Sequence, residues 1–186
     1  LMIKKIPVVV IDPHGEYASV KFANPKERER MHRFGIESRG FLNQVTEFSP
    51  DIKTNTDARP LTLNQENLTA QELIHLLPAK LSPAQLGIMY GALKNLGGRI
   101  TLNDLLFELE ATDDTNSKWT LLNIIDYLRK RNLFATMATS MNDLVVQGKM
   151  SIVNLKGTTY DIQEIVVAKL LTDLFAEPVA FVQVSV

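Results

Sequence analysis

The sequence contains no cysteine. Disulfides and thiolate zinc sites are therefore excluded, and the absence fits the reducing cytoplasm, where we expect the protein to act. No apolar run approaches the roughly 18 residues that cross a bilayer, and no signal peptide precedes the first predicted strand. An excess of charge of one sign is also lacking, since the chain has 20 Lys and Arg and 21 Asp and Glu. A domain that grips DNA by bulk charge is usually more basic, so any DNA contact must come from a local patch or from another part of an assembly.

A glycine-rich phosphate-binding loop is missing as well. The 186 residues contain no G-x-x-x-x-G-K-[ST], and neither Gly97-Gly98 nor Gly157 has that spacing followed by Lys and Ser or Thr. The chain begins at Leu1, which is not an initiator residue, and a strand is predicted almost at once. We therefore expect a segment of a longer protein.

Apolar β patterns occupy both ends of the chain. Residues Ile6–Ile11 (IPVVVI) form a continuous run typical of a strand buried on both faces of a parallel sheet. A short strand is predicted at residues 44–48. Residues 150–155 (MSIVNL), a helix from about Tyr160 to Phe175, and residues 179–186 (VAFVQVSV) predict a strand–helix–strand unit with parallel strands.

Helical signals dominate the middle of the chain. Four stretches have N-cap residues or leucines at helical spacing, and they cover residues 69–77, 83–96, 101–109 and 119–133. Thr69 begins a capping box, Ser82 and Thr101 are N-caps, and Gly97-Gly98 ends the second stretch. Four consecutive helices favour a compact bundle, with the rings of Trp119, Tyr127 and Phe134 in its core. The predicted organisation is an α/β core at residues 1–66 and 141–186, with a helical bundle inserted at residues 67–140.

The stretch with the most chemical content is Ile11–Tyr17 (IDPHGEY). It places Asp12, His14 and Glu16 after a strand, and the carboxyl ends of strands face the ligand crevice in open α/β sheets. Gly15 permits a tight turn there. Asp12 is a candidate for organising a metal-bound water or a phosphate-side hydrogen bond, and Glu16 for orienting or deprotonating an attacking water. The structural alternative is that the strand ends here and Asp12 caps the next turn.

Two further groups of side chains have functional and structural interpretations. Asp12, His14 and Glu16 alternate as metal ligands on a strand do, but the intervening Pro13 and Gly15 disfavour strand geometry, so we predict no dedicated metal site. Arg129, Lys130 and Arg131 end the fourth predicted helix. They are candidates for contacts with DNA phosphates or with a neighbouring subunit. The favoured alternative is that they complement the helix dipole.

Taken in order, these stretches resemble the HerA/FtsK group of P-loop ATPases, especially the HerA-type DNA translocases. IDPHGEY resembles the motif that follows the P-loop helix in that group. Residues 143–155 (DLVVQGKMSIVNL) are similar to the segment in which a loop with Gly-Lys leads into a strand, and residues 161–175 (DIQEIVVAKLLTDLF) resemble the helix that follows it. The helical block occupies the position of the family's helical bundle, so the resemblance covers most of the chain.

The resemblance implies an α/β fold: a partial RecA-like P-loop NTPase sheet with an inserted four-helix bundle. It implies a homo-hexameric helicase or translocase that hydrolyses ATP with Mg²⁺ to move double-stranded DNA through its ring. The implied partner is a NurA-like nuclease, and the implied process is DNA-end processing and repair. Asp12 and Glu16 match the family motif, with Glu16 a candidate for water activation near the γ-phosphate and with His14 and Gly15 in the nucleotide or magnesium vicinity. The missing P-loop, and a last strand without the expected acidic pair, depart from the pattern.

Two other classes of function compete with this one. A non-enzymatic helical module that binds DNA or another subunit is suggested by the small-residue turn at Gly97–Thr101 between two predicted helices. The helix after that turn carries Asp104, Glu108 and Glu110, and it lacks the donors that a DNA-reading helix needs. A small metal-dependent hydrolase centred on Asp12 is the third possibility, and it lacks a second ligand cluster.

Because the phosphate-binding loop and its lysine are missing, we expect the isolated 186-residue chain to hydrolyse Mg-ATP at no substantial rate. Release of inorganic phosphate from the purified chain, measured with and without double-stranded DNA, checks this. Sustained turnover above the buffer blank would contradict it.

Overall fold

The structure, a computed structural model, describes residues 2–65, 70–97 and 100–176. Two compact units make up the chain. The first contains Leu1–Pro60, Ser140–Thr158 and Asp173–Val186, and the second contains Leu61–Thr139 and Thr159–Thr172. The second unit therefore combines the predicted helical block with most of the helix predicted from Tyr160.

A parallel sheet forms the centre of the first unit. Its strands are β1 (Val8–Asp12), β2 (Val45–Ser49), β3 (Arg59–Pro60) and β6 (Met150–Asn154). Their order is β1-β6-β2-β3, and each neighbouring pair is parallel. The predicted fold class, an α/β fold with a parallel sheet and several helices, is confirmed.

The central strand is β6, where Ile152 and Val153 are fully buried. By contrast, β1 is less buried than its apolar sequence predicted, because residues Val8–Ile11 are only half-buried. The physical reason is its place in the sheet: among the described strands, only β6 pairs with β1. The strand predicted at residues 179–186 lies outside the described residues.

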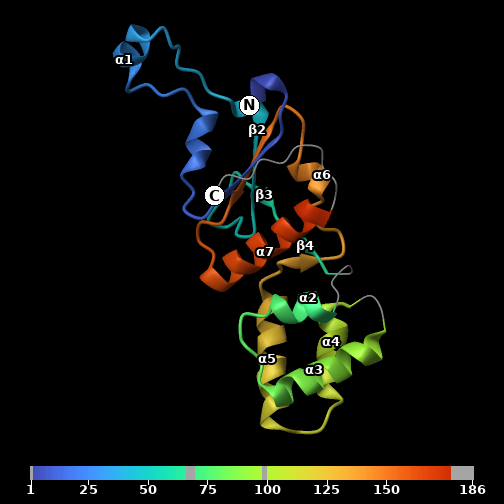
Figure 1. Cartoon of the computed structure of the whole chain (residues 1–186). Helices are drawn as coiled ribbons and strands as arrows, with labels where there is room; N and C mark the ends of the chain where they lie inside the picture. The colour runs from blue at the N-terminus through green and yellow to red at the C-terminus, as the bar shows by residue number, and fades with distance from the viewer. Residues whose placement is uncertain (1, 66–69, 98–99, 177–186) are drawn as a thin grey trace. The chain divides into compact units, whose positions relative to one another are not determined.

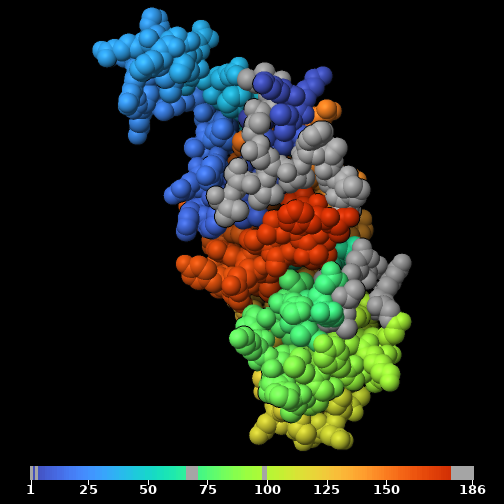
Figure 2. Space-filling view, in the orientation of Figure 1, coloured from blue at the N-terminus to red at the C-terminus, as the bar shows by residue number. Residues whose placement is uncertain are grey.

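Between β1 and β2 the chain leaves the sheet as an arm of short helices. The arm contains η2 (Tyr17–Lys21), α1 (Arg28–Arg33) and η3 (Leu42–Gln44). Figure 1 shows α1 at the tip of this arm, and Figure 2 shows the arm protruding from the surface of its unit. No residue of α1 is buried, so packing contributes little to holding this helix. Two further short helices of this unit are η1 (Met2–Lys4) and α6 (Met141–Leu144).

Helices dominate the second unit. They are α2 (Ala70–His75), α3 (Pro83–Leu96), α4 (Leu102–Glu110), α5 (Asn116–Lys130) and, continuing beyond this unit, α7 (Tyr160–Ala176). A small parallel pair joins β4 (Leu63–Asn64) to β5 (Phe134–Ala135). Helices α3, α4 and α5 contact one another pairwise, around buried side chains that include Met89, Leu105, Leu109, Leu121, Ile125 and Leu128. None of the helices described at residues 2–65, 70–97 and 100–176 is long and apolar enough to cross a membrane.

Local hydrogen bonds decide where the helices begin. Ser82 and Thr101 cap α3 and α4 as their sequences predict. The prediction for α5 was wrong by one turn, because the Thr115 side chain accepts a hydrogen bond from the Lys118 N–H and starts the helix at Asn116. The predicted capping box at Thr69 and the second glycine of Gly97-Gly98 lie outside the described residues.

The aromatic core predicted for the bundle is also wrong in part. Trp119 is 54% exposed, and its indole N–H donates to the Asp114 carboxylate at 2.6 Å. Tyr127 and Phe134 are half-buried. The leucine and isoleucine side chains fill the core, so the bundle depends on aliphatic rather than aromatic packing.

Replacing Leu105, which is fully buried between α4 and its neighbours, tests this packing. We expect Leu105→Ala to lower the free energy of unfolding by about 2–5 kcal/mol, because the change leaves a cavity. Urea denaturation followed by circular dichroism measures it. The matched control is Phe107→Ala in the same helix, where the side chain is 72% exposed and the loss is expected to stay below about 1 kcal/mol.

Candidate functional site

Asp12 ends β1 and is 1% exposed. One carboxylate oxygen accepts the backbone N–H groups of Gly15 at 2.9 Å and Glu16 at 3.1 Å, and the other accepts that of Tyr17 at 3.0 Å. Three donors compensate a carboxylate that burial would otherwise destabilise. This geometry matches the structural interpretation, in which Asp12 caps the next turn, and a direct role for Asp12 in chemistry stays a prediction.

Gly15 lies where this turn contacts the loop that follows the neighbouring strand, β6. Its φ of +74° is a conformation that side chains rarely adopt. A Cβ atom at this position would lie 2.9 Å from Cδ of Lys156 and 3.2 Å from Oδ1 of Asn154. Glycine is therefore required twice, for the backbone conformation and for the close approach of the loop that follows β6.

A chain of buried polar side chains crosses the carboxyl edge of the sheet. Asn154, which pairs with Asp12 in register, donates through Nδ2 to Oε1 of Glu47 at 2.6 Å. The other Glu47 oxygen pairs with the Lys21 ammonium at 2.5 Å, and both charged side chains are almost fully buried. Strands β6 and β2 and helix η2 are thus tied together at the edge where β1 presents Asp12.

The loop after β2 packs on the same edge. The buried Asn55 amide donates to the Ser49 hydroxyl at 3.0 Å, to the Asp51 carbonyl at 3.1 Å and to the Lys156 carbonyl at 2.8 Å. A hydrogen bond from the Thr54 hydroxyl to Asp51, at 2.6 Å, is the main cause that holds the pKa of the Asp51 carboxyl below its usual value. The loops after β1, β2 and β6 therefore form one ordered surface.

Sequence reasoning missed most of this surface. Lys21, Glu47 and Asn55 were not singled out, and only the polar residue inside the apolar strand VTEFS gave a signal. A charged side chain at a buried strand position needs a partner, so Glu47 alone pointed to a buried contact. Its partners lie 26 and 107 residues away in the sequence, too far for any local pattern to identify.

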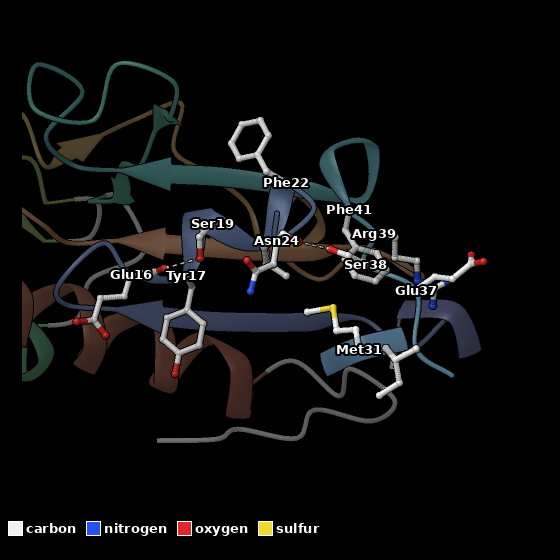
Figure 3. A pocket seen from close by; sticks show the side chains of 12 residues that line it. Glu16, Tyr17, Ser19, Phe22, Asn24, Met31, Glu37, Ser38, Arg39 and Phe41 are labelled. Atoms are coloured by element: carbon white, nitrogen blue, oxygen red, sulfur yellow. Dashed lines mark hydrogen bonds between the residues drawn. The ribbon is translucent and has the colours of Figure 1, made fainter. Parts of the chain in front are cut away.

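Glu16 differs from its neighbours because it is exposed. Among the described residues, its carboxylate has no hydrogen-bond or ion-pair partner. It lines one end of a cavity of about 640 Å³, whose other walls come from the arm and include Tyr17, Phe22, Met31, Ile36 and Arg39. Figure 3 places the Glu16 carboxylate at the end of the cavity nearest the tips of the strand arrows. His14 is exposed on the same turn.

These residues fit one side of a site for a phosphate-bearing cofactor. Glu16 offers an exposed carboxylate that can orient water, and Gly15 lets the Lys156 side chain lie against the same turn. Within the described ranges, no group of three or more His, Asp or Glu side chains is placed to hold a metal ion. The hydrolase alternative centred on Asp12, His14 and Glu16 therefore finds no support in this geometry.

The predicted basic group lies in the other unit, at the end of α5. Arg129 and Lys130 both pair with Asp126, at 2.5 and 2.6 Å, and hydrogen bonds from these two side chains, Lys130 first, lower the pKa of that carboxyl. Arg131 lies over the Tyr127 ring and donates to its hydroxyl at 3.1 Å. Each basic side chain thus has an intramolecular partner, and a contact with DNA or another subunit stays a prediction.

An acidic, glycine-containing turn at the carboxyl edge of a parallel sheet is typical of α/β proteins that bind a ligand at that edge. Residues 1–174 match the family described as "Helicase HerA, central domain", and the chain belongs to this family. The family consists of ATPases of the HerA/FtsK type, which generally use ATP and Mg²⁺ and are typically hexameric and associated with DNA. Among curated proteins, no sequence matches the chain.

The role of Asp12 in fixing the turn is testable by its removal. We expect Asp12→Ala to lower the free energy of unfolding by about 3 kcal/mol, because three backbone N–H groups lose a charged acceptor. Urea denaturation of the 186-residue chain measures the loss. Glu16→Ala, four residues away and exposed, is the control and should change stability by less than about 0.5 kcal/mol. Equal effects of the two substitutions would contradict this account of the turn.

Proposed function

We propose that this chain is part of a HerA-like homo-hexameric ATPase that translocates or unwinds double-stranded DNA in DNA-end processing. The partner of this ATPase would be a NurA-like nuclease. The family match over residues 1–174 is the observation that carries the proposal. The exposed Glu16 carboxylate, held on a turn that Asp12 fixes, supports it by supplying a group suited to phosphoryl transfer.

In this proposal the residues of the turn after β1 have different roles. Asp12 is a positioning residue, because both of its oxygens accept backbone N–H groups. Glu16 faces the nucleotide and orients the attacking water, while Gly15 lets the loop after β6 pack against the turn and His14 lies near the nucleotide. ATP and Mg²⁺ are the cofactors, and a phosphate-binding loop outside residues 1–186 completes the site.

The helical unit has a second candidate function, which is contact with another subunit. A groove of about 450 Å³ between α4 and α5 is lined in part by the exposed rings of Phe107 and Trp119. Exposed aromatic side chains in a groove favour protein contact. The Glu110 carboxylate, which also lines this groove, disfavours DNA phosphates there.

Glu16→Gln, made in the longer protein that carries this chain, tests the proposed function. We expect DNA-stimulated ATP hydrolysis to fall about 100-fold or more, because the amide cannot accept a proton from the attacking water. Phosphate release at saturating Mg-ATP and double-stranded DNA measures it. The control is Glu29→Gln on the exposed surface of α1, which should leave the rate unchanged. A Glu16→Gln protein with wild-type turnover would refute the role of Glu16.

A further inference from the structure

Lys156 follows the central strand β6, and its backbone is held on both sides. The Asn154 side chain accepts the Lys156 N–H at 3.0 Å, and the Asn55 amide donates to the Lys156 carbonyl at 2.8 Å. Both amide side chains are buried, with exposed fractions of 4% and 8%. The backbone of the exposed Lys156 is therefore fixed by two buried side chains.

The stem of the Lys156 side chain lies against the Asp12 turn. Its Cβ and Cδ atoms occupy the space that a side chain at position 15 would need, at 3.2 and 2.9 Å from an ideal Cβ. Gly15 therefore keeps the lysine stem in contact with the turn that carries Glu16. The next residue, Gly157, is equally confined, because a Cβ there would lie 2.8 Å from the Thr54 hydroxyl.

Lys156 is exposed to solvent at this edge of the sheet. In the part of the chain that the structure describes, no carboxylate forms an ion pair with it. Lys21, the other lysine at this edge, is by contrast buried and paired with Glu47. A positioned ammonium and the carboxylate of Glu16 thus reach solvent from two loops in contact, and neither neutralises the other.

We propose that Lys156 contacts the terminal phosphate of the nucleotide, as a cation that the loop after β6 supplies next to the Asp12 turn. This inference rests on the proposed ATPase function. It assigns Lys156 to the terminal phosphate because the lysine lies against the turn that presents Glu16, the residue that orients water at that phosphate. An ammonium serves there as a point charge that stabilises the phosphate oxygens.

Nucleotide binding to the longer protein tests the assignment without turnover. We expect Lys156→Met, which keeps the stem and removes the charge, to raise the Kd for ATPγS about tenfold or more, the loss of one charge-assisted hydrogen bond. The Kd for ADP should stay within about twofold, because ADP has no terminal γ-phosphate. Lys156→Arg, which keeps the charge, should retain most of the ATPγS affinity.

Lys149 provides a matched control, since it is an exposed lysine at the opposite end of the same strand. Lys149→Met should leave both dissociation constants unchanged. The assignment is overturned if Lys156→Met binds ATPγS as the wild type does, if ADP is weakened equally, or if Lys149→Met causes the same loss. A wild-type protein that binds no ATPγS would instead overturn the proposed function, and with it this inference.

Discussion

Burying a carboxylate is costly unless hydrogen-bond donors reach it, and at Asp12 the backbone N–H groups of three consecutive residues supply them. This requirement sets the conformation of the turn and its contact with the loop after β6. The turn that satisfies Asp12 brings Gly15 against the loop after β6, and Asn154 in that region continues the contact to Glu47 and Lys21. The same requirement leaves Glu16 pointing outward, because its backbone N–H, and not its side chain, is used by the turn.

The parts of the fold that depend on local patterns were predictable from the sequence. The apolar run of β1, the capping residues Ser82 and Thr101, and the length of α7 all depend on neighbours within a few residues. Trp119 was misplaced because hydrophobic spacing treats an aromatic ring as core, whereas its indole N–H found an acceptor in Asp114 at the surface.

The candidate site likewise has a part that depends on local sequence and a part that depends on distant residues. The motif around Asp12 could be recognised from seven residues, together with the two interpretations of its carboxylate. The partners of that motif could not, because Asn55, Asn154 and Lys156 reach it only after the sheet has brought three separate loops to one edge. Sequence spacing carries no information on a contact such as that between Asn55 and Lys156, which are 101 residues apart.

The order of the strands in the sheet has a consequence for how the chain folds during its synthesis on the ribosome. Because β6 lies between β1 and β2, the two early strands share no hydrogen bonds and wait for residues 150–154 before the sheet can close. The helices α3, α4 and α5 are synthesised in that interval, which lasts on the order of ten seconds at usual elongation rates, and their contacts are local. During this interval the apolar strand β1 has no partner strand, because β6 is the only described strand that pairs with it, and the nascent chain is then most exposed to aggregation.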